Sequence, residues 1–331
     1  MKKNITIKDI AREAGVSTAT VSRVLSNKGY ASDDIRKKVL AVAKQLNYRQ
    51  NSIAKSLKMH KTNLIGVIIP DISNPYFMKI SKGIEDVVQE KGYNLLFMSG
   101  DENPHKEEKQ LKLLLEHRVD AIIIATSGKN DELISSIHEN DTPVILIDRK
   151  LEAGNEKMDF VVENNFEGAY QLTSYLIRQK HKLIGVVNGS LNVSTGVERF
   201  SGYKKAMEDY AIVQRDELIF NGDFSVEDGR KAIDYFMGLD QRPTAVLSFN
   251  NTMSTGVILQ LDKLGLTIPD DMFLASYGET EVAQLINPKG KISVKQSPYK
   301  MGVKVGEIIL DRLVLHVTGP TQEVFNPQLE K

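Results

Sequence analysis

One stretch decides the fold of the first fifty residues: Ala14-Gly15-Val16-Ser17-Thr18-Ala19-Thr20-Val21-Ser22-Arg23-Val24-Leu25. Gly15 permits a tight turn, and Ser17 is a residue type that caps helices, so we expect a helix over residues 18–25. Upstream, Thr6 is followed three residues later by Asp9, which indicates a capping-box start for a first helix that ends at Gly15. Two short helices around a glycine-containing turn form the helix-turn-helix layout.

A third helix is predicted after Ser32, because four apolar residues then follow at helical spacing: Ile35, Val39, Val42 and Leu46. This apolar stripe gives the first two helices a surface to pack on. The next stretch, 49–58, is mostly polar and too short to be stable as a helix by itself, since isolated helices under about 12 residues are marginal in water. We expect it to be a linker that becomes helical only when a partner is bound.

From residue 63 onward, apolar runs of buried-strand length alternate with amphipathic stretches. The first series lies at 64–69, 93–97, 121–125 and 144–148, and the second at 183–187, 245–249 and 273–277. Repeated units of this kind predict an α/β fold in which parallel sheets are covered by helices on both faces. The two series divide near residues 160–165 and predict two lobes, with a ligand site in the cleft between them.

Charge and composition limit the classes of function. Of 331 residues, 43 are basic and 43 acidic, and none is cysteine, which excludes disulfides, thiol catalysis and cysteine-ligated metals. Residues 1–61 hold ten Lys and four Arg against four acidic residues, a net charge of +10, which leaves −10 for the remainder. A basic head on an acidic body favours a nucleic-acid partner for the head, while a solvated basic face is the alternative.

Other classes have no support in the sequence. It shows no secretory signal pattern and no apolar run of about 20 residues, so we expect a cytoplasmic protein without a membrane partner. It also lacks a glycine-rich phosphate loop, a nucleophile elbow and a metalloprotease motif, and its six His show no ligand spacing. We therefore expect no enzymatic activity, no cofactor and no metal.

Several motifs closely resemble the LacI/GalR family of bacterial transcription regulators. In the head these are residues 6–11, 14–25 and Leu46-Asn47-Tyr48, and in the body Asp71-Ile72-Ser73-Asn74-Pro75-Tyr76-Phe77, Asp148-Arg149, Glu198-Arg199-Phe200-Ser201-Gly202-Tyr203 and Ile268-Pro269-Asp270-Asp271. The resemblance covers nearly the whole chain. It implies an all-α helix-turn-helix head and a two-lobed core of parallel sheets, similar to periplasmic binding proteins.

For the head, the resemblance implies a second helix that lies in the major groove of DNA. Thr18 and Ala19 would lie nearest the base edges, and Arg23 could pair bidentately with guanine. Other head residues would hold the phosphate backbone: Thr6, Ser17, Thr20, Ser22 and Asn27. In the family, residues such as Asn51, Ala54 and Lys55 contact the minor groove and the leucine matching Leu57 is wedged between base pairs. The alternative for Leu57 is a small core of the linker helix.

The resemblance also sets expected domain limits. The head would span 1–48, the hinge helix or linker 49–61, and the effector-binding and dimerisation core 62–331. Within the core, lobe one would comprise about 62–161 and 292–320, and lobe two about 162–291 and 321–331. The resemblance implies a dimeric core, which would bind a palindromic double-stranded operator. The chain has no leucine heptads after its last strand-like segment, so we expect a dimer without the tetramer-forming tail of some members.

In the cleft, motif positions identify candidate effector-binding residues: Tyr76, Phe77, Asp148, Arg199, Phe224, Asn250 and Gly278. The alternatives are core packing for Phe77 and Phe224 and a surface ion pair for Arg199. Where the family commonly has an aspartate that binds ligand hydroxyls, this chain has Gly278. We therefore expect an anionic sugar, such as a sugar acid, because an aspartate would repel it and Arg199 would favour it.

These features predict a repressor of a carbohydrate-utilisation operon that is controlled allosterically by a small sugar-type effector. The alternative is a catabolite-control regulator of the same fold whose co-regulator is a phosphorylated carrier protein. The sequence leaves open whether the effector releases DNA or strengthens binding, because linkage requires only that the two sites be coupled reciprocally.

Overall fold

The computed structural model describes residues 5–26, 29–48, 61–280, 282–283 and 291–330. The chain divides into two compact units, residues 1–62 and residues 63–331. The predictions that concern Asn27, the linker 49–60 and its residues Asn51, Ala54, Lys55 and Leu57 fall outside the described residues.

The described part of the first unit contains three helices, α1 (Ile7–Ala14), α2 (Thr18–Leu25) and α3 (Asp33–Gln45). Thr6 and Asp9 form the predicted capping box, and Gly15 ends α1 in the left-handed conformation with φ 63°. The Ser17 side chain accepts a hydrogen bond from the Thr20 N–H at 3.1 Å and so caps α2. The helices share one small core, whose fully or largely buried members are Ile10, Ala11, Ala14, Val21, Val24, Val39 and Ala43. The helix-turn-helix prediction is confirmed.

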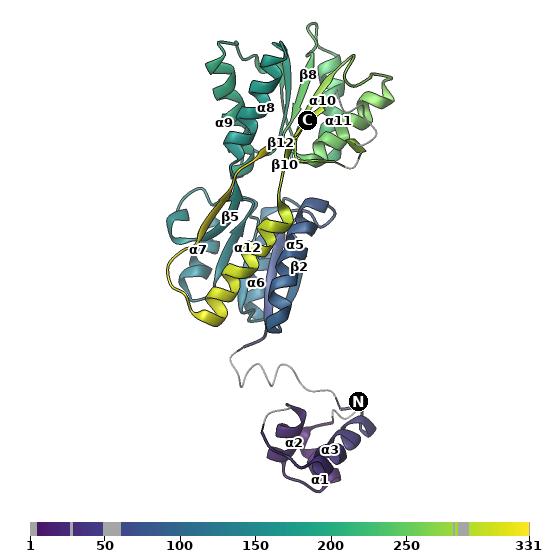
Figure 1. Cartoon of the computed structure of the whole chain (residues 1–331), viewed down its shortest axis with the longest axis vertical. Helices are drawn as coiled ribbons and strands as arrows, with labels where there is room; N and C mark the ends of the chain where they lie inside the picture. Colours follow the sequence, from purple (N-terminus) through teal and green to yellow (C-terminus); the bar gives the residue numbers. More distant parts are fainter. Residues whose placement is uncertain (1–4, 27–28, 49–60, 281, 284–290, 331) are drawn as a thin grey trace. The chain divides into compact units, whose positions relative to one another are not determined.

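The residues described in the second unit form two six-stranded sheets (Figure 1). The first sheet has the order β11-β5-β4-β3-β1-β2, in which every pair is parallel. Its strands are β1 (Leu64–Ile69), β2 (Asn94–Ser99), β3 (Ala121–Ile124), β4 (Val144–Ile147), β5 (Asp159–Glu163) and β11 (Gln322–Phe325).

Helices cover both faces of this sheet. One face packs on α5 (Pro75–Val88) and α12 (Pro298–Leu310), and the other on α6 (Pro104–Glu116) and α7 (Asp131–Glu139). Beyond α12, a π-helical turn covers Asp311–Leu315. Strand β1 contributes to both cores, since Ile65 and Val67 point to one face and Ile68 to the other.

The second sheet has the order β12-β10-β9-β8-β6-β7 and is parallel apart from the antiparallel pair β10 and β12. Its strands are β6 (Ile184–Asn188), β7 (Ile219–Asn221), β8 (Ala245–Ser248), β9 (Phe273–Tyr277), β10 (Lys291–Lys295) and β12 (Gln328–Glu330). Figure 1 shows α8 (Asn165–Arg178) and α9 (Ser194–Asp209) on one side of it and α10 (Val226–Met237) and α11 (Asn251–Lys263) on the other.

The chain passes between the two sheets three times, as expected, but at slightly different residues. The first passage follows Glu163, where β5 ends. The second follows Lys295, because β10 belongs to the second sheet, and the third follows Phe325, because β11 belongs to the first. The expected limits near 292 and 321 therefore lie about four residues too early, and they place β10 and β11 in the wrong lobes. The reason is that strand pairing decides to which lobe each strand belongs, and the sequence does not show this pairing.

Candidate functional site

The exposed side of α2 is the candidate nucleic-acid surface of the head. Val21 and Val24 are buried on the opposite side, where they pack on α1 and α3. Six of the predicted DNA contacts lie at the surface and one, Thr20, is half-buried; the exposed ones are Thr6, Ser17, Thr18, Ala19, Ser22 and Arg23. The side chains of Thr6 and Ser17 already serve as helix caps, so they have fewer free hydrogen-bonding groups than Thr18 or Ser22.

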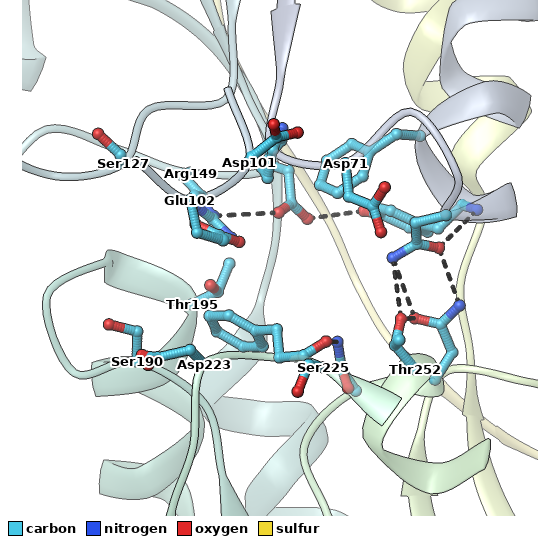
Figure 2. Close-up of a pocket in the computed structure, with 18 of the residues that line it drawn as sticks. Asp71, Asp101, Glu102, Ser127, Arg149, Ser190, Thr195, Asp223, Ser225 and Thr252 are labelled. Atoms are coloured by element: carbon cyan, nitrogen blue, oxygen red, sulfur yellow. Dashed lines mark hydrogen bonds and ion pairs between the residues drawn. The ribbon is translucent and has the colours of Figure 1, made fainter. Parts of the chain in front are cut away.

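Between the lobes lies a cavity of about 620 Å³ (Figure 2). Six predicted effector residues line it together: Tyr76, Phe77, Asp148, Arg199, Phe224 and Asn250. The seventh, Gly278, is buried nearby and is not among the lining residues. The cavity lies at the carboxyl ends of the parallel strands, where ligands bind in open α/β sheets.

Asp148 lies at the end of β4 in the left-handed conformation, with φ 65°. It accepts a hydrogen bond from the Tyr76 hydroxyl at 2.8 Å, and the rings of Tyr76 and Phe77 meet edge to face with centroids 5.2 Å apart. Burial raises the pKa of Asp148, although Arg199 and Arg149 oppose the shift. The same burial, with the neighbouring carboxylate, raises the pKa of Tyr76, which therefore stays a neutral donor.

Arg199 is held rigidly from three sides and is only 5% exposed. Its Nε donates to Asn165 Oδ1 at 2.8 Å, and one terminal nitrogen donates to the Phe249 carbonyl at 2.6 Å. Its guanidinium also lies 3.8 Å from the centroid of the Tyr277 ring. A fixed guanidinium binds a ligand oxygen without first losing side-chain entropy. The surface ion-pair interpretation of Arg199 does not apply, because these partners are neutral and buried.

Arg149, which is buried, and Glu102, which is half-buried, form an ion pair in the site that the sequence did not predict. The Arg149 guanidinium is 3% exposed and contacts both carboxylate oxygens of Glu102, at 2.8 and 2.5 Å. It also lies 5.3 Å from the centroid of the Phe224 ring. Asp148-Arg149 was among the motifs quoted above, so the sequence did contain a signal for Arg149, whereas Glu102 had none.

Phe224 and Asn250 belong to one local arrangement in lobe two. The Asn250 side chain accepts from the Met253 N–H at 2.7 Å and so caps α11, and its amide nitrogen donates to the Phe224 carbonyl at 3.3 Å. Phe224 has φ 66°, which projects its ring over the backbone of Gly189. Phe224 is partly buried against the lobe-two core and also lines the cavity. Core packing and a position in the cavity wall are therefore both features of this ring.

Hydrogen bonds also cross directly from lobe to lobe. The Asn74 side chain exchanges two hydrogen bonds with Asn251, at 3.0 and 3.4 Å, and donates to Thr252 Oγ1 at 3.3 Å (Figure 2). On another edge of the cavity, the Lys150 N–H donates to Ser194 Oγ at 2.8 Å. None of these groups was predicted, since the pairs are far apart in the sequence.

The charges of the cavity do not favour an anion. Its lining includes five carboxylates and three cations: Asp71, Asp101, Glu102, Asp148 and Asp223 against Lys129, Arg149 and Arg199. Arg149 is already neutralised by Glu102. The expectation of a sugar acid, which considered Arg199 without these carboxylates, therefore finds no support in the electrostatics of the site. The described residues form no group that could hold a metal ion, and none of their helices is long and apolar enough to cross a membrane.

Comparisons with known proteins match both units. The family described as "Bacterial regulatory proteins, lacI family" matches residues 6–51, and "Periplasmic binding proteins and sugar binding domain of LacI family" matches residues 62–316. The HTH-type transcriptional repressor PurR of Actinobacillus pleuropneumoniae serotype 3 (strain JL03) is 33% identical over 326 residues, which are 98% of this chain and 96% of the relative.

Solved structures agree with this match. A LacI family transcriptional regulator from Enterococcus faecium with bound ribose is 25% identical, with a TM-score of 0.71 over 81% of this chain and 97% of that one. The transcription regulator CcpA of Lactococcus lactis is 26% identical, with a TM-score of 0.72 over 81% and 97%. The lac repressor dimer bound to operator and the anti-inducer ONPF is 22% identical and shares the fold, with a TM-score of 0.81 over 99% and 98%.

Proposed function

Since the chain belongs to the LacI family of bacterial transcriptional repressors, we propose that it binds a palindromic operator as a homodimer and responds to a small, neutral, sugar-type effector in its interlobe cavity. One observation carries the proposal: the chain combines a helix-turn-helix head, whose second helix exposes a polar face, with a polar interlobe cavity of about 620 Å³. The first feature suits DNA and the second suits a small ligand.

On DNA, the exposed face of α2 supplies the base contacts. Arg23 is the residue with a bidentate donor set, and it distinguishes guanine by about 1–3 kcal/mol. Thr18 and Ala19 offer a hydroxyl and a methyl group to neighbouring base edges. The remaining polar residues of the set hold phosphates and fix the register of the head without reading sequence.

A neutral, hydroxyl-rich effector fits the cavity better than an anion. Carboxylates such as Asp148 accept hydrogen bonds from ligand hydroxyls, and the fixed Arg199 donates to ligand oxygens. The Phe224 ring supplies an apolar surface for the face of a sugar ring. The Enterococcus faecium regulator with bound ribose supports this chemistry. The 33% identical relative is named the HTH-type transcriptional repressor PurR, a name that mentions no sugar, so it does not support this part of the proposal.

A thermal-shift panel on the full chain tests the effector class, since a ligand that binds the folded state raises the unfolding midpoint. The panel contains ribose and cellobiose, gluconate and glucuronate, sugar phosphates, nucleobases and nucleosides. We expect a shift with a neutral sugar that is lost in Phe224→Leu and kept in Phe220→Leu, because Phe220 packs on the same core outside the cavity lining. A shift confined to nucleobases, nucleosides or sugar acids would overturn the proposed effector class.

The CcpA neighbour supports a second candidate, a regulator of the same fold that responds to a phosphorylated carrier protein. This candidate predicts that no compound of the panel shifts the midpoint and that the core retains the phosphorylated carrier protein but not its unphosphorylated form.

A further inference from the structure

One residue, Glu163, lies at all three passages between the lobes. It is the last residue of β5, so the first passage begins directly after it. Its carboxylate accepts hydrogen bonds from Gln296 and Ser297, which form the second passage between β10 and α12. In the strand register it lies opposite Phe325, the last residue of β11, after which the third passage begins. The carboxylate of Glu163 therefore lies where the lobes are joined, and it is bonded to the second passage directly.

The hydrogen bonds of Glu163 suit an ionised carboxylate, which has acceptors on both oxygens. Gln296 Nε2 donates to Glu163 Oε2 at 2.7 Å, and the Ser297 N–H donates to Glu163 Oε1 at 3.3 Å, so both oxygens act as acceptors. The other end of the amide, Gln296 Oε1, lies beside Gly278, where a Cβ atom would approach it to 2.6 Å. Gly278 thus leaves room for the amide of Gln296, and Gln296 itself lines the cavity.

Glu163 is buried among few charges. Burial raises its pKa to about 7, although the hydrogen bond from Gln296 and the charge of Arg199 oppose the shift. The titratable groups that face it come from four different elements: Asp148 after β4, Arg199 on α9, Tyr76 on α5 and Tyr277 on β9. Both tyrosines have a raised pKa and stay neutral. Arg199 faces both carboxyl groups, and Arg149 is a second cation beside Asp148, with Nε 3.9 Å from Oδ2.

We propose that Glu163 and Gln296 form a proton-controlled positioning pair, in which the charge of Glu163 decides which end of the Gln296 amide turns toward Gly278 and the cavity. Ionised Glu163 accepts from the amide N–H, which leaves the amide oxygen toward Gly278. Glu163 protonated by solvent donates its O–H to the amide oxygen instead, so the amide turns over and presents its N–H groups. The ligand consequence rests on the proposed function: an effector meets an acceptor at high pH and a donor at low pH.

Nuclear magnetic resonance of the full chain labelled with 15N-glutamine tests the pair without effector or DNA. The side-chain amide signal that disappears in both Gln296→Met and Gln296→Asn identifies Gln296, so the assignment does not depend on one variant folding. We expect this signal to move with pH, with a midpoint at about 7. In Glu163→Gln, which holds a neutral amide at position 163, we expect the signal to stay constant. A signal that is constant in the wild type, or that titrates equally in Glu163→Gln, would overturn the proposal.

Thermal unfolding gives an independent test with a defined sign. The folded-state pKa lies above the usual glutamate value of about 4.3, so between these values the folded state binds the proton more tightly than the unfolded state. The wild type therefore loses stability as pH rises through this window and reaches a plateau above it. We therefore expect the unfolding midpoint of Glu163→Gln minus that of the wild type to be about 3–5 °C larger at pH 8.5 than at pH 5.5.

Glu167→Gln is the matched control, because Glu167 also accepts a hydrogen bond from a glutamine amide, that of Gln171 at 2.7 Å, but is not fully buried. We expect its difference from the wild type to be the same at both pH values. An equal gain in both variants would contradict the role of Glu163. Neither experiment uses a ligand, so the two proposals can fail separately. If both experiments give the expected results but no sugar shifts the unfolding midpoint, the sugar assignment is wrong and the Glu163–Gln296 pair stands.

Discussion

At the scale of single residues, the shape of the cavity depends on side chains that approach the backbone very closely. Phe224 lies so near Gly189 that a Cβ atom at position 189 would come within 1.9 Å of its ring. Such a distance is far below van der Waals contact, so the ring would have to leave its place over the cavity or the backbone would have to shift. Gly189 is therefore a requirement of the aromatic wall.

The variant Gly189→Ala should lower the free energy of unfolding by about 1–3 kcal/mol, the usual cost of overpacking. Gly100→Ala is the control, because its added Cβ would make only an ordinary contact, 3.6 Å from the Ile69 carbonyl. Urea unfolding of both variants measures the difference. Equal stabilities would show that the Phe224 ring moves at no cost and does not form a fixed wall.

Sequence reasoning found those cavity residues that occupy recognisable motif positions, such as Arg199 and Asp148. It missed residues whose role arises only when distant segments meet. Glu102 is 47 positions from Arg149, and Asn74 is 177 positions from Asn251. It also treated Gly278 as a lining residue, whereas the space beside Gly278 is occupied by the Gln296 amide. No local pattern in one sequence contains this information.

At the scale of elements, capping residues define the head. Ser17 precedes α2 and Ser32 precedes α3. The Ser17 side chain accepts a hydrogen bond from the Thr20 N–H at 3.1 Å, whereas the Ser32 side chain accepts none from the first turn of α3. Both serines are suitable residue types, so the sequence alone could not distinguish the two caps. This difference provides a matched pair of substitutions within one small unit.

We expect Ser17→Ala to destabilise the head by about 1 kcal/mol, because the α2 amide loses its acceptor, and Ser32→Ala to cost clearly less. Hydrogen exchange of the helical amides in the full chain reports the stability of the head separately from the core. A larger effect for Ser32→Ala would contradict the capping described here.

Strands were predictable where they are uniformly apolar. β1, β3, β4, β6, β8 and β9 lie inside their sheets and agree with the predicted runs to within a residue or two. β7, β11 and β12 were missed because they are edge strands of three or four residues that include polar side chains. β10 was missed because Lys and Ser interrupt its apolar residues, and the interior strand β5 was missed because Asp159 and Glu163 leave it only three apolar residues. These short strands decide where the chain passes between lobes, which explains the error in the lobe limits.

At the scale of the whole molecule, the two parts of the proposed function belong to two units. The basic head and its exposed α2 face are suited to DNA, while the acidic body contains the interlobe cavity. Family membership joins these functions in a single repressor. Coupling between them must be reciprocal, so an effector that weakens operator binding is itself bound more weakly by the operator complex.

Selection of bound duplexes from a random pool by the full chain tests this account most directly, because it requires both sequence reading and a two-fold dimer. We predict enrichment of a palindrome with two half-sites. In Arg23→Ala we expect the protein to lose its preference for one base pair of each half-site and to keep the affinity that depends on phosphate contacts. Enrichment of a non-palindromic sequence, or no enrichment above the random pool, would contradict the central claim that the chain is a dimeric, sequence-specific repressor.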